Sequence, residues 1–146
     1  MTDKTVALAA DHAGYELKQC LAKELTSLGY SLLDLGTNGP ESVDYPDYGK
    51  AIATALASKK APCGVIVCGT GIGISIAANR NPAVRAALCH DTTTARLARQ
   101  HNDANVLAIG ARITGLETAK DILLAFLDTP FEGGRHAGRV EKLGAP

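Results

Sequence analysis

The segment best suited to chemistry is a glycine-rich turn, Cys68-Gly-Thr-Gly-Ile-Gly73. Glycines at alternate positions let several backbone N–H groups point at one anion where a helix begins. The turn is not a P-loop, because no Lys-Ser/Thr pair follows it, and Ile74 stands where a tyrosine-phosphatase loop would need arginine. It also follows the third predicted strand, whereas a dinucleotide fingerprint follows the first. We therefore expect it to stabilise a transient anion such as an enediolate.

Cys68 has two interpretations on spacing alone. Beside a helix N-terminus it would have increased thiolate character and would act as a base next to the bound anion. As an ordinary core residue it would simply end a buried strand, which is the commoner role of cysteine. The spacing leaves both interpretations open.

Three further groups of residues could take part in chemistry. Asp11 and His12 follow an apolar run, where Asp11 would either cap a helix or contact a ligand. The segment His101-Asn102-Asp103 follows the fourth predicted helix, where a histidine is often only a solvated neighbour of the helix end. Arg135 and Arg139 are four residues apart, so a helix would place both guanidinium groups on one face for phosphate binding. A solubilising tail is the alternative.

The elements that position these residues follow from apolar patterning. Val6–Ala10 is apolar without alternation, as in a parallel strand covered on both faces. The leucines at 17, 21, 25 and 28 recur at helical spacing, and Gly29 is a stop signal. The same alternation continues with strands at about 30–35, 64–68, 84–88 and 106–109, and helices at about 46–58, from 73, at 92–100 and at 114–127.

Alternating strands and helices predict an α/β, doubly wound (Rossmann-like) five-stranded parallel sheet with helices on both faces and a C-terminal arm. Such sheets bind ligands beyond the carboxyl ends of their strands. Asp11-His12, the turn 68–73 and Cys89-His-Asp91 would lie there. With 146 residues we expect a single domain, 1–146, whose polar tail from about 130 to 146 reaches over another surface, such as that of a second subunit.

Composition limits the class of protein. The formal net charge is zero, so no overall field would hold nucleic acid or an anionic membrane. The four cysteines form no CxxC pair, which favours reduced thiols in the cytoplasm. There is no apolar signal region and no apolar run of membrane-spanning length. We expect a cytoplasmic protein that binds its anion locally.

Several segments along nearly the whole chain together resemble one family, the type B ribose-5-phosphate isomerases, which are grouped with galactose- and allose-6-phosphate isomerases. The resemblance is carried, in order, by Ala9-Ala-Asp-His-Ala-Gly14, Asp44-Tyr-Pro-Asp47, Val67-Cys-Gly-Thr-Gly-Ile-Gly73, Ala77-Ala-Asn-Arg80, Arg85-Ala-Ala-Leu-Cys-His-Asp91, Arg99-Gln-His-Asn-Asp-Ala-Asn105, Gly134, Arg135, His136 and Arg139.

The resemblance implies roles for individual residues. Cys68 would be the base that moves a proton between C1 and C2, and Thr70 with His101 would open the furanose ring. Asp11 and Asn102 would bind or relay protons to the hydroxyl and carbonyl groups. The remaining implied residues hold the substrate. The backbone N–H groups from Gly69 through Gly71 to Gly73 would bind the enediolate. His12, Arg135 and Arg139 would bind the phosphate, and Tyr45 and Arg112 would line the pocket.

In this family the site lies between two subunits, so the resemblance implies a homodimer or a dimer of dimers in which His101 and Asn102 face Cys68 of the partner subunit. One subgroup has a glutamate base at the position of Ile74 and no cysteine at that of Cys68, so this chain sorts with the cysteine subgroup. No histidine and carboxylate cluster with metal-ligand spacing is visible, so we expect neither metal nor cofactor, and proton transfer in place of a hydride shift.

The expected reaction is therefore the interconversion of ribose 5-phosphate and ribulose 5-phosphate, a step of the pentose phosphate pathway. An allose- or galactose-6-phosphate isomerase is a close alternative, because a six-carbon sugar needs only a slightly longer pocket. A non-catalytic sugar-phosphate sensor and a thiol redox protein, which would use Cys68 and Cys89 at the ends of neighbouring strands, are more distant alternatives.

Overall fold

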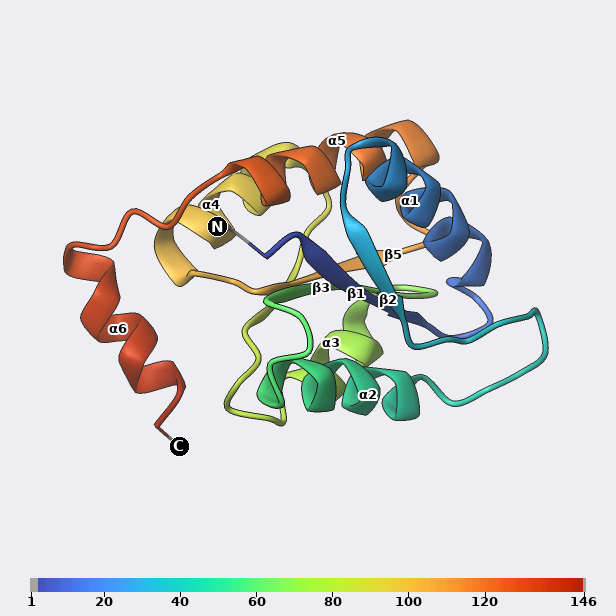
Figure 1. Ribbon diagram of the computed structural model, residues 1–146, viewed down its shortest axis with the longest axis horizontal. Helices are drawn as coiled ribbons and strands as arrows, with labels where there is room; N and C mark the ends of the chain where they lie inside the picture. The colour runs from blue at the N-terminus through green and yellow to red at the C-terminus, as the bar shows by residue number, and fades with distance from the viewer. Residues whose placement is uncertain (1–2, 146) are drawn as a thin grey trace.

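The computed structural model describes residues 3–145, and within them a five-stranded, wholly parallel sheet forms the centre of the molecule (Figure 1). Its strand order is β2-β1-β3-β5-β4. This confirms the predicted fold class. The strands are β1 (Thr5–Ala10), β2 (Ser31–Asp34), β3 (Cys63–Cys68), β4 (Ala86–Leu88) and β5 (Val106–Gly110).

Helices cover both faces of the sheet (Figure 1). One face carries α1, α4 and α5, and the other carries α2 and α3, while α6 lies outside these layers beside α4. No helix among residues 3–145 is both long and apolar enough to cross a bilayer. The helices are α1 (Tyr15–Ser27), α2 (Tyr45–Ala57), α3 (Ile72–Ala78), α4 (Thr92–Asn102), α5 (Leu116–Asp128) and α6 (Arg135–Leu143).

The strand β1 shows why the sheet is built from unbroken apolar runs. Val6, Leu8 and Ala10 face the core under α1, α4 and α5, whereas Ala7 and Ala9 face the core under α2 and α3. All five side chains are fully buried. Alternate residues of one strand therefore fill two different cores, and a polar residue at any of them would be unpaired.

Two sequence-based expectations about the sheet need correction. The strand predicted at 84–88 begins only at Ala86, because the N–H of Arg85 donates to the side-chain Oδ1 of Asn105 at 2.8 Å. Cys68 and Cys89 were expected at the ends of neighbouring strands, and this is wrong, because β5 lies between β3 and β4. The order of strands in space is set by packing of the crossover helices and does not follow the order in the chain.

Candidate active site

Cys68 is the last residue of β3 and its side chain is held in the turn that follows. Its Sγ accepts a hydrogen bond from the N–H of Gly71 at 3.1 Å, and the residue is only 4% exposed. Gly71 has φ +77°, and a Cβ there would meet the side chain of Leu88 and the backbone of β5. A glycine is therefore required to bring this N–H up to the sulfur.

The short helix α3 begins directly after Gly71 and has seven residues. Because a helix dipole grows with the number of aligned peptides, α3 stabilises a bound anion less than a full-length helix would. The individual N–H groups of the turn are therefore the main local donors. Thr70 is exposed, and its Oγ1 accepts the N–H of Ile72 at 3.2 Å, which fixes the hydroxyl at the rim of the turn.

Two predicted pocket residues lie against the other glycines of the turn. The ring of Tyr45, at the start of α2, packs on Gly73, where any Cβ would collide with it. The Arg112 side chain passes beside Gly69, with Nε 3.4 Å from where a Cβ would stand. The N–H of Arg112 also donates to the carbonyl of Gly69 at 2.9 Å. The structure thus brings Tyr45 and Arg112 to the Cys68 turn.

Asp11 lies beside the same turn and is 6% exposed. Its own N–H donates to the carbonyl of Val67 at 3.2 Å, which fixes it next to the end of β3. Its Oδ1 accepts the N–H of Gly14 at 3.1 Å, and Gly14 is the N-cap residue of α1. The carboxylate therefore orders the turn before α1 and lies at the carboxyl edge of the sheet, but it does not cap the helix as the capping interpretation predicted, because the N-cap residue is Gly14 and no side chain caps it.

His12 is exposed at this edge, and its Nδ1 accepts the N–H of Val43 at 3.1 Å. A ring nitrogen that accepts a hydrogen bond carries no proton, so in this arrangement the proton is on Nε2. His12 therefore offers an Nε2–H donor, suited to a phosphate oxygen.

The other predicted residues lie at the opposite edge of the sheet. His101 and Asn102 are the last two residues of α4, not residues that follow it, because the left-handed Asp103, with φ 45°, ends the helix two residues later than predicted. They line a cavity of about 390 Å³ together with Arg135 and Arg139. Arg135 and Arg139 lie one helical turn apart in α6, as expected for a helical tail. Within one chain, the structure does not bring these four residues to Cys68.

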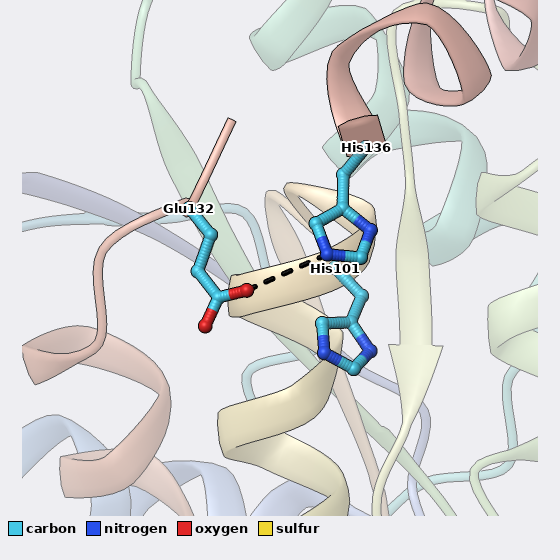
Figure 2. Close-up of side chains that lie close together, drawn as sticks. All are labelled: His101, Glu132 and His136. Carbon is cyan, nitrogen blue, oxygen red and sulfur yellow. Dashed lines mark ion pairs between the residues drawn. The ribbon is translucent and has the colours of Figure 1, made fainter. Parts of the chain in front are cut away.

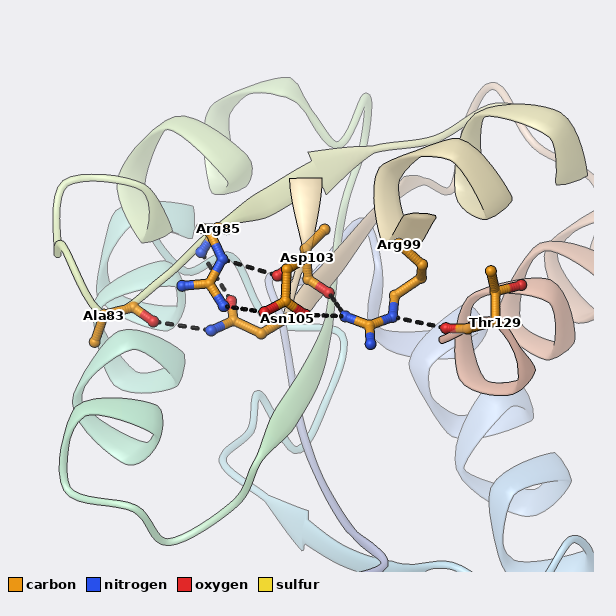
Figure 3. Close-up of polar contacts among 7 residues, drawn as sticks. Ala83, Arg85, Arg99, Asp103, Asn105 and Thr129 are labelled. Carbon is orange, nitrogen blue, oxygen red and sulfur yellow. Dashed lines mark hydrogen bonds and ion pairs between the residues drawn. The ribbon is translucent and has the colours of Figure 1, made fainter. Parts of the chain in front are cut away.

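A polar network holds the end of α4 in place (Figure 3). Arg85 donates through Nε to the carbonyl of Asp103 at 2.8 Å, and Arg99 pairs with the Asp103 carboxylate at 3.0 Å. Arg99 also donates through Nε to the carbonyl of Thr129 at 3.1 Å, at the end of α5. The segment 99–105 is therefore held in place by these contacts, and it fixes the positions of His101 and Asn102.

Glu132 and His136 join His101 in a cluster that the sequence did not reveal (Figure 2). The rings of His101 and His136 stack with centroids 4.5 Å apart, and Oε1 of Glu132 lies 3.4 Å from Nε2 of His136. The three residues come from α4, the α5–α6 connection and α6. Glu132 and His136 are four residues apart, but this spacing could not place them beside His101, because only the path of the C-terminal arm across α4 brings the three together.

Two other thiols are electrostatically unsuited to reaction. Burial raises the pKa of Cys63 to about 11, partly offset by the positive charge of Arg99. Burial likewise raises the pKa of Cys89 to about 11. Thiols with such pKa values are almost entirely protonated at neutral pH, and a protonated thiol is a poor nucleophile. This weakens the thiol-redox alternative, which needs Cys89.

Comparison with known proteins settles the class of molecule. The family model described as Ribose/Galactose Isomerase matches residues 6–143. The chain belongs to this family. Ribose-5-phosphate isomerase B of Escherichia coli strain K12 is 46% identical over 142 residues, which cover 97% of this chain and 95% of that protein.

Solved structures agree with this family membership. The ribose-5-phosphate isomerase RpiB of Thermotoga maritima has a TM-score of 0.96 at 46% identity, covering 99% of this chain and all of that chain. The Clostridium thermocellum ribose-5-phosphate isomerase B has a TM-score of 0.95 at 50% identity, covering 97% and 95% of the two chains. The resemblance inferred from the sequence is thus confirmed, and the chain is an aldose–ketose isomerase.

Proposed function

We propose that this enzyme interconverts ribose 5-phosphate and ribulose 5-phosphate through an enediolate, with Cys68 as the base. The observation that carries the proposal is the turn 68–73, in which a thiol and backbone N–H donors meet at the carboxyl edge of β3. Relatives that bear this activity in their names are about as long as this chain and nearly half identical to it.

The reaction begins with ring opening, because the closed furanose has no carbonyl to acidify the C2–H bond. In the proposed arrangement His101 and Thr70 move the proton between the ring oxygen and O1, which frees the C1 aldehyde. The Cys68 thiolate then takes the C2 proton, and the electron pair moves to form the C1–C2 double bond and an oxyanion at O1. The thiol, whose proton exchanges with solvent, then donates a proton to C1, while Asp11 relays the proton of the C2 hydroxyl to O1, so that C2 becomes the ketone. General-base catalysis of this kind contributes about 10²–10⁴-fold in rate.

Backbone donors stabilise the oxyanion formed in the middle of this sequence. The Gly71 N–H is held by Cys68 Sγ and the Ile72 N–H by Thr70 Oγ1, so the other N–H groups of the turn are the donors for the oxyanion. Their positions are preorganised, because Gly71 is fixed by its positive φ and by contact with β5. Asp11 and Asn102 hold and relay protons among the hydroxyl oxygens. Phosphate binds to the Nε2–H of His12 and to the guanidinium groups of Arg135 and Arg139, while Tyr45 and Arg112 close the sides of the pocket.

This arrangement requires a homodimer with shared sites, either alone or as part of a dimer of dimers. Two observations support it. His101, Asn102 and the paired arginines lie at the edge of the sheet opposite Cys68. The carboxyl edge also exposes large apolar side chains, between 41% and 59% accessible, which favour a protein contact. They are Tyr45, Ile72, Ile76, Ile113 and Leu116.

A shared site also accounts for the cavities of the single chain. A cavity of about 500 Å³ lies between α2 and α3, lined by Lys50, Ala77 and Arg80 among others, and includes none of the proposed site residues. The Cys68 turn forms no large cavity within residues 3–145 of one chain, because a site completed by a second chain has only half of its wall on the first.

The remaining proposals concern context. Residues 1–146 form one isomerase domain, with the arm from about 130 extending to a second subunit. All four cysteines are free thiols, which favours the reducing cytoplasm and a role in the pentose phosphate pathway. An allose- or galactose-6-phosphate substrate remains the alternative, since pocket length decides between five- and six-carbon sugars.

The test is kcat/KM on five- and six-carbon aldose phosphates, for the wild type, Cys68→Ala and a matched control, Cys20→Ala, whose thiol lies on α1. We expect ribose 5-phosphate to be the preferred substrate and only the Cys68 variant to lose activity, by about 10²-fold or more. Preference for a six-carbon substrate would favour the alternative. Phosphate-sugar binding without exchange of the C2 proton would point to a sensor.

A further inference from the structure

The cluster of His101, Glu132 and His136 has the composition and spacing of a transition-metal site (Figure 2). One ligand atom from each residue lies within 4.8 Å of the other two. Imidazole nitrogens and a carboxylate oxygen together are ligands that Zn²⁺ and similar ions prefer. Three such ligands with one open position are typical of sites that bind a fourth, exchangeable ligand.

The geometry needs little change to close around an ion. Ligand atoms about 2.1 Å from a tetrahedral zinc stand about 3.4 Å from one another. Nε2 of His136 and Oε1 of Glu132 are already 3.4 Å apart. The His101 ring is stacked on His136 at the end of α4, so it must rotate out of this stacking before one of its nitrogens points toward the same position.

Backbone contacts fix the segment that carries the cluster. The N–H of Glu132 donates to the carbonyl of Gln100 at 3.1 Å, which fixes the arm beside α4. Gly133 and Gly134, with φ +68° and +54°, then turn the chain into α6. His136 is 7% exposed, so one of the three ligands is already withdrawn from water.

From these observations we propose that His101, Glu132 and His136 form a binding site for a divalent transition-metal ion such as Zn²⁺. Arg135 and Arg139 line the same cavity, and their positive charges weaken the binding of a cation. The site is therefore one that fills and empties with the metal concentration.

Metal binding at this site is inhibitory. This consequence rests on the proposed function, in which a ring nitrogen of His101 takes part in opening the furanose. Coordination occupies that nitrogen's lone pair, so a chain with bound metal can no longer move the proton. The metal also links α4 to α6, so it stabilises the folded arm as any ligand specific to the native state does.

The binding test uses chelator-treated protein and Zn²⁺ titrated by calorimetry, with Co²⁺ absorption as a second probe. We expect one ion per chain for the wild type, and affinity at least about tenfold weaker for Glu132→Gln and for His136→Gln. The controls Glu141→Gln, on the exposed face of α6, and Cys68→Ala should bind as the wild type does. Equal binding by Glu132→Gln and the wild type, or loss of binding in Cys68→Ala, would overturn the site.

The activity test separates this proposal from the proposed function. Metal-free Glu132→Gln should isomerise as fast as the wild type, yet need at least about tenfold more Zn²⁺ for half inhibition. Equal sensitivity of the two proteins to Zn²⁺ would overturn the inhibitory role. If the metal-free wild type has no isomerase activity while the binding pattern holds, the proposed function fails and the metal site stands.

Discussion

The N–H of Gly71 lies 3.1 Å from Sγ of Cys68, and this contact depends on a left-handed backbone at Gly71. The contact fixes the sulfur in the turn, beside the backbone donors. The same turn leaves its N–H groups other than those of Gly71 and Ile72 for an oxyanion. Both halves of the proposed chemistry, the base and the oxyanion donors, therefore depend on one glycine.

Replacement of Gly71 by alanine should accordingly impair both activity and stability. The positive φ and the collision of the new Cβ with Leu88 and Gly110 would displace the turn, at a cost of about 1–3 kcal/mol. We expect a fall in kcat together with a lower denaturant midpoint. The matched control is Gly115→Ala, because Gly115 has φ −70° and no atom near a new Cβ. Normal kcat in Gly71→Ala would contradict the role of the turn.

Mixing two inactive variants tests whether sites are shared between chains. Cys68→Ala and His101→Asn should each be nearly inactive alone. After co-refolding in equal amounts, half of the dimers are mixed, and each mixed dimer has one intact site, so activity should recover to about one quarter of wild type. Two variants that disable the same residues, such as Cys68→Ala with Cys68→Ser, are the control. No recovery in the first mixture would mean that Cys68 and His101 do not act across an interface.

Loss of the ion pair between Lys18 and Asp34 should lower the stability of the fold, and a second substitution should restore much of it. The Lys18 side chain is fully buried, and its Nζ lies 2.7 Å from Oδ1 of Asp34, which also accepts the N–H of Gly36. Asp34→Asn would leave a buried ammonium without its counter-charge and should destabilise the fold by about 3 kcal/mol. The double variant Lys18→Met/Asp34→Asn should recover much of this loss in urea unfolding. A single variant as stable as the wild type would contradict the account.

The N-cap of α4 predicts a pH-dependent contribution to stability. Hydrogen bonds from the backbone N–H and the hydroxyl of Thr94 lower the pKa of Asp91 below its ordinary value of 3.8. Because the folded-state pKa is the lower one, the stabilisation is complete well above pH 3.8 and is lost as the pH falls through the folded-state pKa. The stability difference between wild type and Asp91→Ala should be constant near neutral pH and shrink in acid. If the stability difference between the two proteins increased in acid, the proposed role of the Asp91 carboxylate would be contradicted.

The parts of the fold predicted from sequence were those fixed by local physics. Val6–Ala10 lacks alternation because both of its faces are buried, so its pattern alone indicates a central parallel strand. Gly29 ends the first helix with φ +90°, as its position indicated. The cysteine turn was recognisable for a similar reason, since the left-handed φ of +77° at Gly71 is a local requirement that favours glycine.

What the sequence could not give was set by contacts between distant segments. The place of β5 between β3 and β4 depends on how the crossover helices pack, so Cys68 and Cys89 were wrongly expected on neighbouring strands. The predicted end of α4 was wrong because Asp103, a residue with no β-branch, adopts the left-handed conformation, in which Arg85 and Arg99 bind it. The roles proposed for the individual site residues stay predictions.

The account rests on proton transfer by Cys68, and isomerisation of ribose 5-phosphate in D₂O tests it most directly. The wild type should produce ribulose 5-phosphate that carries deuterium at C1, because the thiol exchanges its proton with solvent between removal and return. Cys68→Ala should neither isomerise nor label the sugar. Rapid conversion to an unlabelled product would indicate a hydride shift, and labelling by the alanine variant at the wild-type rate would show that another residue is the base.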